Sequence, residues 1–250
     1  ISDWLCRAST GTGLTVRKLR TDSTPIVYSG SCPILLNGID NIAQRSDLIS
    51  RSLIINLKAL ADGQRLTKSE VNEKFNALRP KLLGILLDAL SVILKDLPET
   101  NVTTNHRMID VIKWATPAEQ LLGFATGTVQ EVCERNYSDT IATSLNDDLL
   151  CSILLEHINS LKRPQWSGTM TKLLTTLTSR APDKVRSHKD WPKRAQTLSM
   201  YLNRRIKGLC DYGIEIQQDR EGGSGNRKYT ITNHNFPSPE VAEPEENMAA

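Results

Sequence analysis

The chain has 250 residues, of which 39% are hydrophobic and 24% are charged, so it can form one large globular domain or two to three small ones. Its net charge of +3 is too small to indicate a nucleic-acid partner by itself. No apolar run approaches the roughly 18 residues of a membrane-spanning helix, so we expect no membrane partner.

The cysteines and histidines indicate a reducing compartment and no metal site. The five cysteines are scattered without metal-binding spacing, which is typical of a cytoplasmic protein. Four of them, all except Cys32, lie among apolar neighbours and are expected to be buried as small hydrophobic residues. The four histidines are far apart in the sequence. We therefore expect a cytoplasmic location and no bound metal.

Residues 1–62 alternate between short helical and β patterns. Ile1–Ser9 has the periodicity of a helix end, and Leu14–Tyr28 has the alternation of a β-hairpin. The apolar runs Ile34–Leu36 and Leu53–Leu57 are typical of strands that are buried on both faces. Between these two runs there is room for only a turn or two of helix.

Residues 63–161 have a helical period. Thr67 is a candidate N-cap, with Glu70 as the acid of a capping box, and Pro80 is expected to break or restart the first helix. Asn146 is a candidate cap for the last one. About five helices are predicted, near Thr67–Pro80, Leu82–Leu97, Met108–Trp114, Thr126–Ser144 and Asp147–Leu161.

Residues 162–232 return to a mixed pattern. They predict a helix at Met170–Thr178, a polar loop at Arg180–Asp190, a helix at Arg194–Leu209 ended by Gly213, and strands at Ile214–Gln217 and Lys228–Thr232 around a glycine-rich turn. This order is typical of a winged helix. Residues 233–250 are rich in proline and glutamate and are predicted to be disordered.

Basic residues gather in the predicted winged helix. From Arg180 to Lys228 there are twelve Lys and Arg against six Asp and Glu, and the tail that follows carries only acids. The candidate DNA contacts are the basic residues of the second helix and of the wing: Lys193, Arg194, Arg204, Arg205, Lys207, Arg220, Arg227 and Lys228. The alternative is a solvated helix face on a protein-binding winged helix. Little argues for base-specific reading, since Asn203 is the only obvious amide.

The hairpin Leu14–Tyr28 carries a second basic group, formed by Arg17, Lys18 and Arg20. These residues can touch a nucleic-acid strand if the hairpin projects from an α/β core. The alternative is an exposed arm whose charges only keep it soluble.

A third candidate site consists of Asn37, Arg45 and Arg51. An amide at a strand tip can orient a water or a phosphate, and an arginine before the next strand can act as an arginine finger on a neighbouring subunit's phosphate. The alternative is that Asn37 caps a turn while the arginines pair with Asp40 and Asp47. Composition alone favours this alternative.

Several segments together resemble the P-loop ATPase core of phages, plasmids and integrated elements, a family related to the AAA+ hexameric replicative helicases and often fused to or paired with primases. The segments are Trp4–Ala8 with Thr10–Gly13, Val16–Leu19, Pro33–Ile39, Arg45–Leu48 and Ser50–Ser52, and weaker similarities lie in the Trp166–Thr169 and Trp191–Lys193 regions. The resemblance implies that Asn37 is the sensor residue and that Arg51, less surely Arg45, is the arginine finger. It also implies that Arg17, Lys18 and Arg20 line a DNA channel.

The sequence departs from this family in two places. It contains neither a Walker A nor a Walker B motif, so the resemblance implies ATP and Mg²⁺ only for a full-length protein and none bound by this chain alone. Leu19-Arg20 also stands where the family pattern has Leu-Tyr, which leaves the role of the hairpin open.

We therefore expect a mixed α/β, mostly α fold with four parts: an ATPase-core portion at 1–62, a helical bundle at 63–161, a winged helix at 162–232 and an acidic tail at 233–250. The implied function is that of the C-terminal portion of an ATP-dependent DNA helicase of a mobile element, hexameric when whole and with a possible primase partner. One alternative is a non-enzymatic DNA-binding regulator or replication-initiation adaptor. Another is a protein-interaction scaffold.

Overall fold

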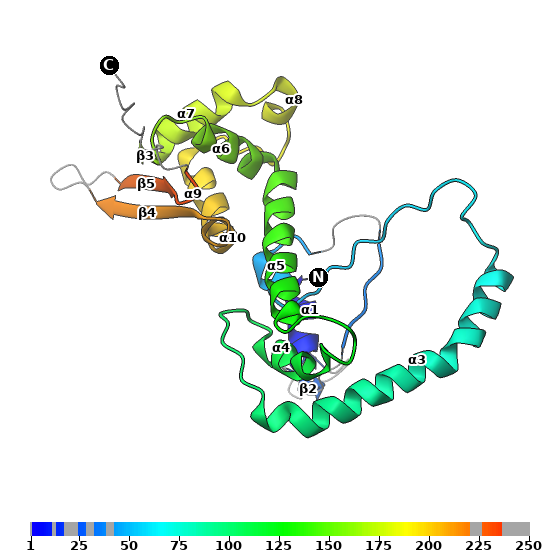
Figure 1. Ribbon diagram of the computed structural model, residues 1–250. Coiled ribbons are helices and arrows are strands. Elements are labelled where there is room, and N and C mark those ends of the chain that lie inside the picture. Colours follow the sequence, from blue (N-terminus) through cyan, green and yellow to red (C-terminus); the bar gives the residue numbers. More distant parts are fainter. Residues whose placement is uncertain are drawn as a thin grey trace, which may run out of the picture. The chain divides into compact units, whose positions relative to one another are not determined.

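The computed structural model describes residues 2–11, 14–17, 25–28, 33–38, 43–220 and 227–236 and shows a mixed α/β, mostly helical protein (Figure 1). The chain divides into two compact units, 1–141 and 142–250. The division falls within the long helix α5 (Thr128–Asp147). Among the described residues no helix is long and apolar enough to cross a membrane.

The N-terminal unit begins with the helix and hairpin that the sequence predicts. Helix α1 covers Ser2–Thr10, and strands β1 (Leu14–Arg17) and β2 (Pro25–Tyr28) pair in an antiparallel ladder. In this ladder Leu14 is the partner of Tyr28 and Arg17 is the partner of Pro25. The short helix α2 (Ser46–Ile49) agrees with the expectation of no more than a turn or two of helix in this region.

The prediction of two buried strands, at Ile34–Leu36 and at Leu53–Leu57, is wrong. Both segments lie in irregular backbone, and their large side chains face solvent, with Leu35 94% and Ile55 79% exposed. A strand buried on both faces needs sheet neighbours and covering helices. Within the described residues the only ladder of this unit joins β1 to β2, so these runs have no such neighbours.

Helix α3 (Lys68–Asp96) starts at the predicted cap but does not stop at the predicted break. Thr67 and Glu70 form the full capping box, which confirms that prediction. The helix continues through Pro80, contrary to expectation. Proline removes one main-chain donor, and because this stretch of the helix is exposed, solvent can satisfy the carbonyl that loses its partner.

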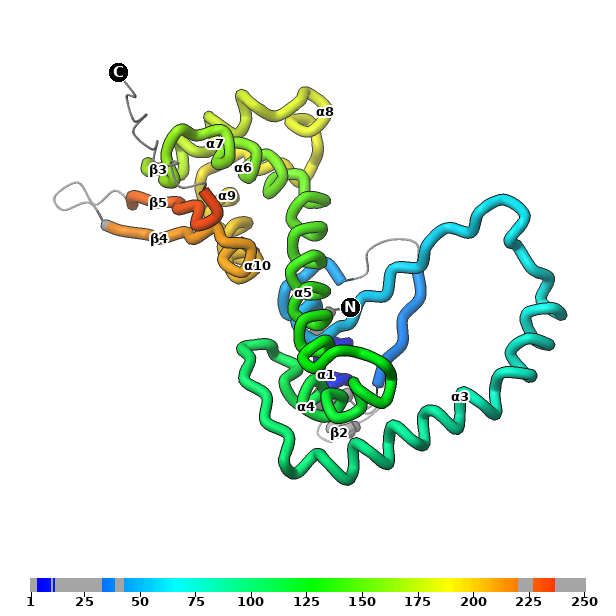
Figure 2. Tube along the Cα trace, viewed as in Figure 1, coloured from blue at the N-terminus to red at the C-terminus, as the bar shows by residue number. Residues whose placement is uncertain are grey.

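The rest of the N-terminal unit is built from short helical pieces: η1 (Leu97–Glu99), α4 (Ile109–Ala115), η2 (Thr116–Ala118) and the first part of α5. A small core of Ala89, Ile93 and Ala118 joins the end of α3 to η2. Figure 2 follows the long exposed connection that leads from the 53–57 run into α3. The Asn136 side chain of α5 holds the start of this connection, because it both donates to and accepts from the main chain of Ile54.

The C-terminal unit contains five helices and three strands among its described residues. They follow the order α6 (Leu149–Asn159), β3 (Gln165–Gly168), α7 (Met170–Arg180), α8 (Asp183–Arg186), α9 (Ala195–Asn203), α10 (Ile206–Asp211), β4 (Ile214–Arg220) and β5 (Arg227–Asn233). The strands form an antiparallel sheet in the order β3-β5-β4. Ile231 of the central strand is fully buried and pairs with Trp166 and Ile216 on either side.

Several details of this unit differ from the sequence prediction. Trp166–Gly168 belongs to a third strand, which is too short for a periodic pattern to reveal. The cap of α6 is Asp148, not Asn146. The expected loop at Arg180–Asp190 contains helix α8. Asn233, which was predicted to begin a disordered tail, is a buried residue of β5, and its side-chain amide donates to the Asn159 side chain. Residues 237–250 lie outside the described residues.

The predicted helix Arg194–Leu209 is two helices, with a break at Arg204–Arg205. Ile206, which is at the start of the second helix, is 40% exposed. Gly213 does end α10 as predicted. Its φ of 94° is in the left-handed region, and a Cβ there would lie 2.5 Å from the Asn235 amide, so only glycine fits without movement.

The cysteine prediction holds only in part. Cys133 and Cys151 are buried, Cys6 is half-buried and Cys210 is exposed, while Cys32 lies outside the described residues. Cys210 is exposed because it lies on the last turn of the short helix α10, beside the fully buried Leu209 that faces the core.

His157 is a buried titratable group in α6. Only 5% of its surface is exposed, and within the part of the chain that the structure describes neither ring nitrogen has a hydrogen-bond partner. Burial lowers the pKa of this imidazole, and the positive charge of Arg180 lowers it further. The folded unit therefore holds the neutral ring.

Acid should destabilise the C-terminal unit through His157. As the pH falls through the ordinary histidine pKa near 6.5, the unfolded state binds a proton that the folded state does not. The free energy of unfolding then decreases by up to about 1.4 kcal/mol per pH unit until the lowered pKa of the folded state is reached. Urea denaturation on either side of pH 6.5 measures this loss. The loss of stability in acid should be smaller in the His157→Leu variant than in the parent chain, and in the exposed control His188→Leu it should equal that of the parent chain. If His157→Leu loses as much stability as the parent chain, His157 is not the group responsible.

Candidate nucleic-acid interface

The carboxylate of Asp148 joins the start of α6 to the α9–α10 break. Its Oδ1 accepts from the main-chain N–H groups of Leu150 and Cys151, at 3.1 and 2.9 Å, as an N-cap does. The Tyr201 hydroxyl donates to Asp148 at 2.8 Å, and Arg205 Nε donates to Oδ2 at 2.6 Å. One side chain thus fixes two elements that are more than fifty residues apart in sequence.

This cluster is mostly shielded from solvent, and its Tyr201 hydroxyl and Cys151 thiol stay protonated at neutral pH. The Asp148 side chain is 12% exposed and that of Arg205 33% exposed, and the Arg205 guanidinium lies 3.7 Å from the centre of the Tyr201 ring. Burial, and then the bond to Asp148, raise the pKa of Tyr201, while burial and the Asp148 charge raise the pKa of Cys151. Tyr201 is therefore a hydrogen-bond donor to the carboxylate at neutral pH.

The break between α9 and α10 lies at the residue that makes this pair. Arg205 leaves helical geometry, with φ −112° and ψ 0°, and its side chain bonds Asp148. The adjacent Arg204 is exposed. Two neighbouring arginines that the sequence treats as equivalent DNA contacts thus have different surroundings: Arg205 is committed to an ion pair within the unit, and Arg204 faces solvent.

Helix α9 buries one side and presents the other to solvent. Leu198 and Leu202 are buried and face the core that α7 shares with α9. The opposite side consists of exposed residues at helical spacing: Gln196, Thr197, Met200, Asn203 and Arg204. We call these five residues the outer face of α9. It carries no acidic residue.

Basic residues border this outer face along the chain. Lys193 and Arg194 immediately precede α9 and are exposed, and Arg194 is its N-cap. Lys207, in α10, is exposed but forms an i,i+4 pair with Asp211 at 2.8 Å. Of the predicted contacts on this segment, Lys193, Arg194 and Arg204 are thus exposed without a carboxylate partner among the described residues.

The β4–β5 hairpin carries the other basic group. Arg227 and Lys228 are exposed at the start of β5, and Arg220 is the register partner of Arg227 at the end of the ladder. The hairpin tip itself, 221–226, lies outside the described residues.

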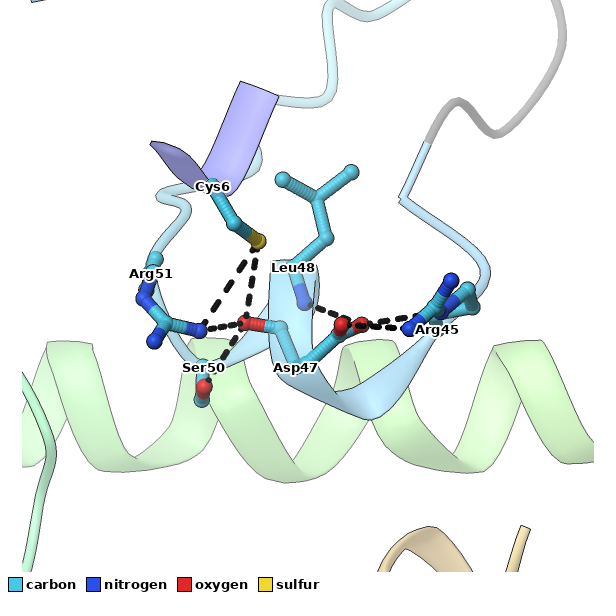
Figure 3. Close-up of polar contacts among 6 residues, drawn as sticks. All are labelled: Cys6, Arg45, Asp47, Leu48, Ser50 and Arg51. Carbon is cyan, nitrogen blue, oxygen red and sulfur yellow. Dashed lines mark hydrogen bonds and ion pairs between the residues drawn. The ribbon is translucent and has the colours of Figure 1, made fainter. Parts of the chain in front are cut away.

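In the N-terminal unit, Arg45 and Arg51 both bind Asp47 but through different atoms (Figure 3). Arg45 Nη2 lies 2.7 Å from Asp47 Oδ2, which is the ion pair that the composition-based alternative predicts. Arg51 Nη1 instead donates to the Asp47 carbonyl oxygen at 2.7 Å and lies 3.8 Å from Cys6 Sγ. The Arg51 Nε is buried and has no hydrogen-bond partner among the described residues.

The other predicted residues of this unit are not brought into a described site. Asn37 is exposed in the irregular segment 33–38. Arg17 is the last residue of β1, and Lys18 and Arg20 lie outside the described residues, as does Asp40. Within the described ranges, no group of three His, Cys, Asp or Glu residues is placed to hold a metal ion.

Sequence reasoning missed Asp148, Tyr201 and most of the outer face of α9. Asp148 looks like an ordinary polar residue between helices, and only its distant partners reveal its role. Gln196 and Met200 could have been found from their spacing to Asn203, which the sequence analysis did name, because positions i, i+4 and i+7 share one side of a helix. The basic residues around them were more conspicuous.

Two family models match the chain. Residues 1–148, more than half of it, match the model described as actinomycete integrative conjugative element replication protein. Residues 150–243 match the model of the C-terminal domain of the same RepA proteins. The boundary between the two matches falls at Asp148 and Leu149, where α6 begins. No curated protein and no solved structure was found to match.

The two adjacent arginines should respond differently to truncation. Arg205→Ala leaves the Asp148 carboxylate without its ion-pair partner in a mostly buried place, so we expect a loss of about 2–3 kcal/mol in the free energy of unfolding. Arg204→Ala removes an exposed side chain and should cost less than about 0.5 kcal/mol. Urea denaturation of both variants measures the difference. If the two variants have the same free energy of unfolding, the Asp148–Arg205 ion pair does not stabilise the unit.

Proposed function

Because the chain belongs to the family of actinomycete integrative conjugative element replication proteins, we propose that its C-terminal unit is a winged-helix domain that binds the element's DNA. The family makes the chain a replication protein of a mobile genetic element. DNA is the polymer on which such a protein acts, and the arrangement of the C-terminal unit supports the finer assignment.

The order of elements is the main support for a winged helix. A helix (α6), a short strand (β3), a helix (α7), the short helix α8, a helix with a break (α9–α10) and a hairpin (β4–β5) follow one another, and the sheet order is β3-β5-β4. In this arrangement α9 takes the place of the helix that enters the major groove. The β4–β5 hairpin takes the place of the wing that contacts the flanking backbone.

The single observation that carries the DNA proposal is the outer face of α9, which is exposed, free of acids, includes Arg204 and is preceded in the chain by Lys193 and Arg194. A face of this kind can approach a polyanion without like-charge repulsion. The Arg220–Arg227 register pair gives the hairpin a second positive group. A protein-binding scaffold would not require cations at both places, so we favour DNA over the scaffold.

DNA binding should depend steeply on salt and on the residues before α9. Each phosphate contact releases a counterion, so the double variant Lys193→Ala/Arg194→Ala should weaken binding and reduce the slope of log Kd against log salt by about 1 to 2. Fluorescence anisotropy with a labelled duplex measures both quantities.

The matched control is Arg79→Ala/Lys81→Ala on α3, which removes the same two charges from exposed positions in the N-terminal unit. It should leave the affinity and the salt slope of the chain nearly unchanged. If the control loses as much affinity as the α9 variant, binding reflects net charge alone and the proposed interface is wrong. If the duplex does not bind at low salt, the DNA proposal itself fails.

A second candidate function is a contribution to an ATP site, with Asn37 as sensor residue and Arg51 as a finger acting on a neighbouring subunit. The order of the β1–β2 hairpin, Asn37 and Arg51 along the chain favours it, as does the fixed position of Arg51 between Asp47 and Cys6. Such a protein would use ATP and Mg²⁺, act as a hexamer and could cooperate with a primase. Arg45, already paired with Asp47, is the weaker finger candidate.

This second function predicts that the 250-residue chain alone hydrolyses no ATP, since its sequence has no phosphate-binding loop. In the complete gene product, Arg51→Ala should lower ATP turnover by at least about a thousandfold while nucleotide affinity persists, because a finger stabilises the transition state more than the bound nucleotide. Arg65→Ala, an exposed arginine in irregular backbone, is the control. Turnover that survives Arg51→Ala would exclude the finger role.

A further inference from the structure

We propose that the outer face of α9 reads A·T base pairs in the major groove, so that the C-terminal unit prefers DNA containing adenines about three base pairs apart. This inference rests on the proposed DNA-binding function and adds a sequence preference to it. It differs from the expectation drawn from composition, in which lysine and arginine dominate and base-specific reading is not expected.

The first support is the chemistry of the face. A stripe of exposed, uncharged residues, Gln196, Met200 and Asn203, runs along α9, whereas Lys193 and Arg194 precede the helix and Arg204 follows it. Phosphate contacts position a helix, and the side chains that meet the base edges read the sequence. A surface that served only for phosphate binding would have cations along this stripe as well.

The second support is the match between these side chains and one kind of base pair. Gln and Asn amides form bidentate hydrogen bonds with N6 and N7 of adenine. The methyl groups of Thr197 and Met200 can pack against the C5-methyl of thymine, which cytosine lacks. Specific guanine contacts use Arg or Lys, and in this face only Arg204, at the end of the helix, could make one.

The third support is the spacing. Gln196 and Asn203 are seven positions apart on one side of the helix, which corresponds to about 10.5 Å along the axis. Base pairs repeat every 3.4 Å, so for a helix that runs parallel to the DNA axis the two amides are about three base pairs apart. Helix α9 has nine residues and is about 13.5 Å long, enough to span roughly four base pairs.

The position of the face is fixed from inside the unit. Leu198 and Leu202 hold the opposite side of α9 in the core, Ser199 lies 3.4 Å from the Tyr229 hydroxyl, and Tyr201 bonds Asp148. Because every buried contact comes from other positions of α9, the outer residues can be replaced without touching the core. This separation makes the proposal testable by substitution.

The experiment selects bound duplexes from a pool with a randomised central window, using the complete 250-residue chain, and sequences them. We expect enrichment of adenine at two positions about three base pairs apart. Gln196→Ala should remove the preference at one position and Asn203→Ala at the other. Each should reduce discrimination against G·C at its position by about five- to a hundredfold, with less change in affinity for unselected DNA. Gln64→Ala, an exposed amide in the N-terminal unit, should change neither quantity.

The outcomes separate this inference from the proposed function. Salt-dependent binding without enrichment would overturn the inference and leave DNA binding in place. Enrichment that persists in both variants, with unchanged thermal midpoints, would also overturn it. No binding of any duplex would overturn both. A preference that disappears position by position in the two variants supports the inference.

Discussion

The side chain of Asp148 is the constraint on which the C-terminal unit depends. It caps α6, accepts the Tyr201 hydroxyl and pairs with Arg205 within hydrogen-bonding distance. Tyr201 bonds the carboxylate from the same helix whose Leu198 and Leu202 are buried in the core, so these contacts together hold the inner side of α9. The direction of the outer face is therefore a consequence of an interaction on the inner side of the helix.

This constraint also divides the basic residues into two kinds. Arg205 stabilises the fold, and Lys207 is held by Asp211, whereas Lys193, Arg194 and Arg204 remain exposed for a ligand. A polyanion that meets the unit would then encounter cations at the ends of α9 and uncharged hydrogen-bonding groups between them. In the proposed complex, the cations would contact phosphates and the uncharged groups would meet the base edges.

The N-terminal unit has a different balance of buried and exposed surface. Helix α3 shows large apolar side chains to solvent along most of its length, and the runs at 34–36 and 53–57 do the same. Within α3 only the last turns bury residues: Ala89 and Ile93 form a small core with Ala118. Several polar contacts of this unit are local: Asp47 binds two nearby arginines, and the Glu119 carboxylate accepts from the N–H groups of Gly127 and Val129.

The sequence by itself determined the elements whose cause is local. The capping box of Thr67 and Glu70, the β1–β2 hairpin, the end of α10 at Gly213 and the succession of helices before a basic hairpin all follow from short-range periodicity and turn chemistry. Tertiary structure decided what depends on distant partners. It left the apolar runs at 34–36 and 53–57 outside a sheet, because strands form only where neighbours can pair with them. It also placed Arg205, where the predicted helix breaks, beside Asp148. Local sequence could not predict this ion pair, because its energy depends on a partner that is distant in the chain.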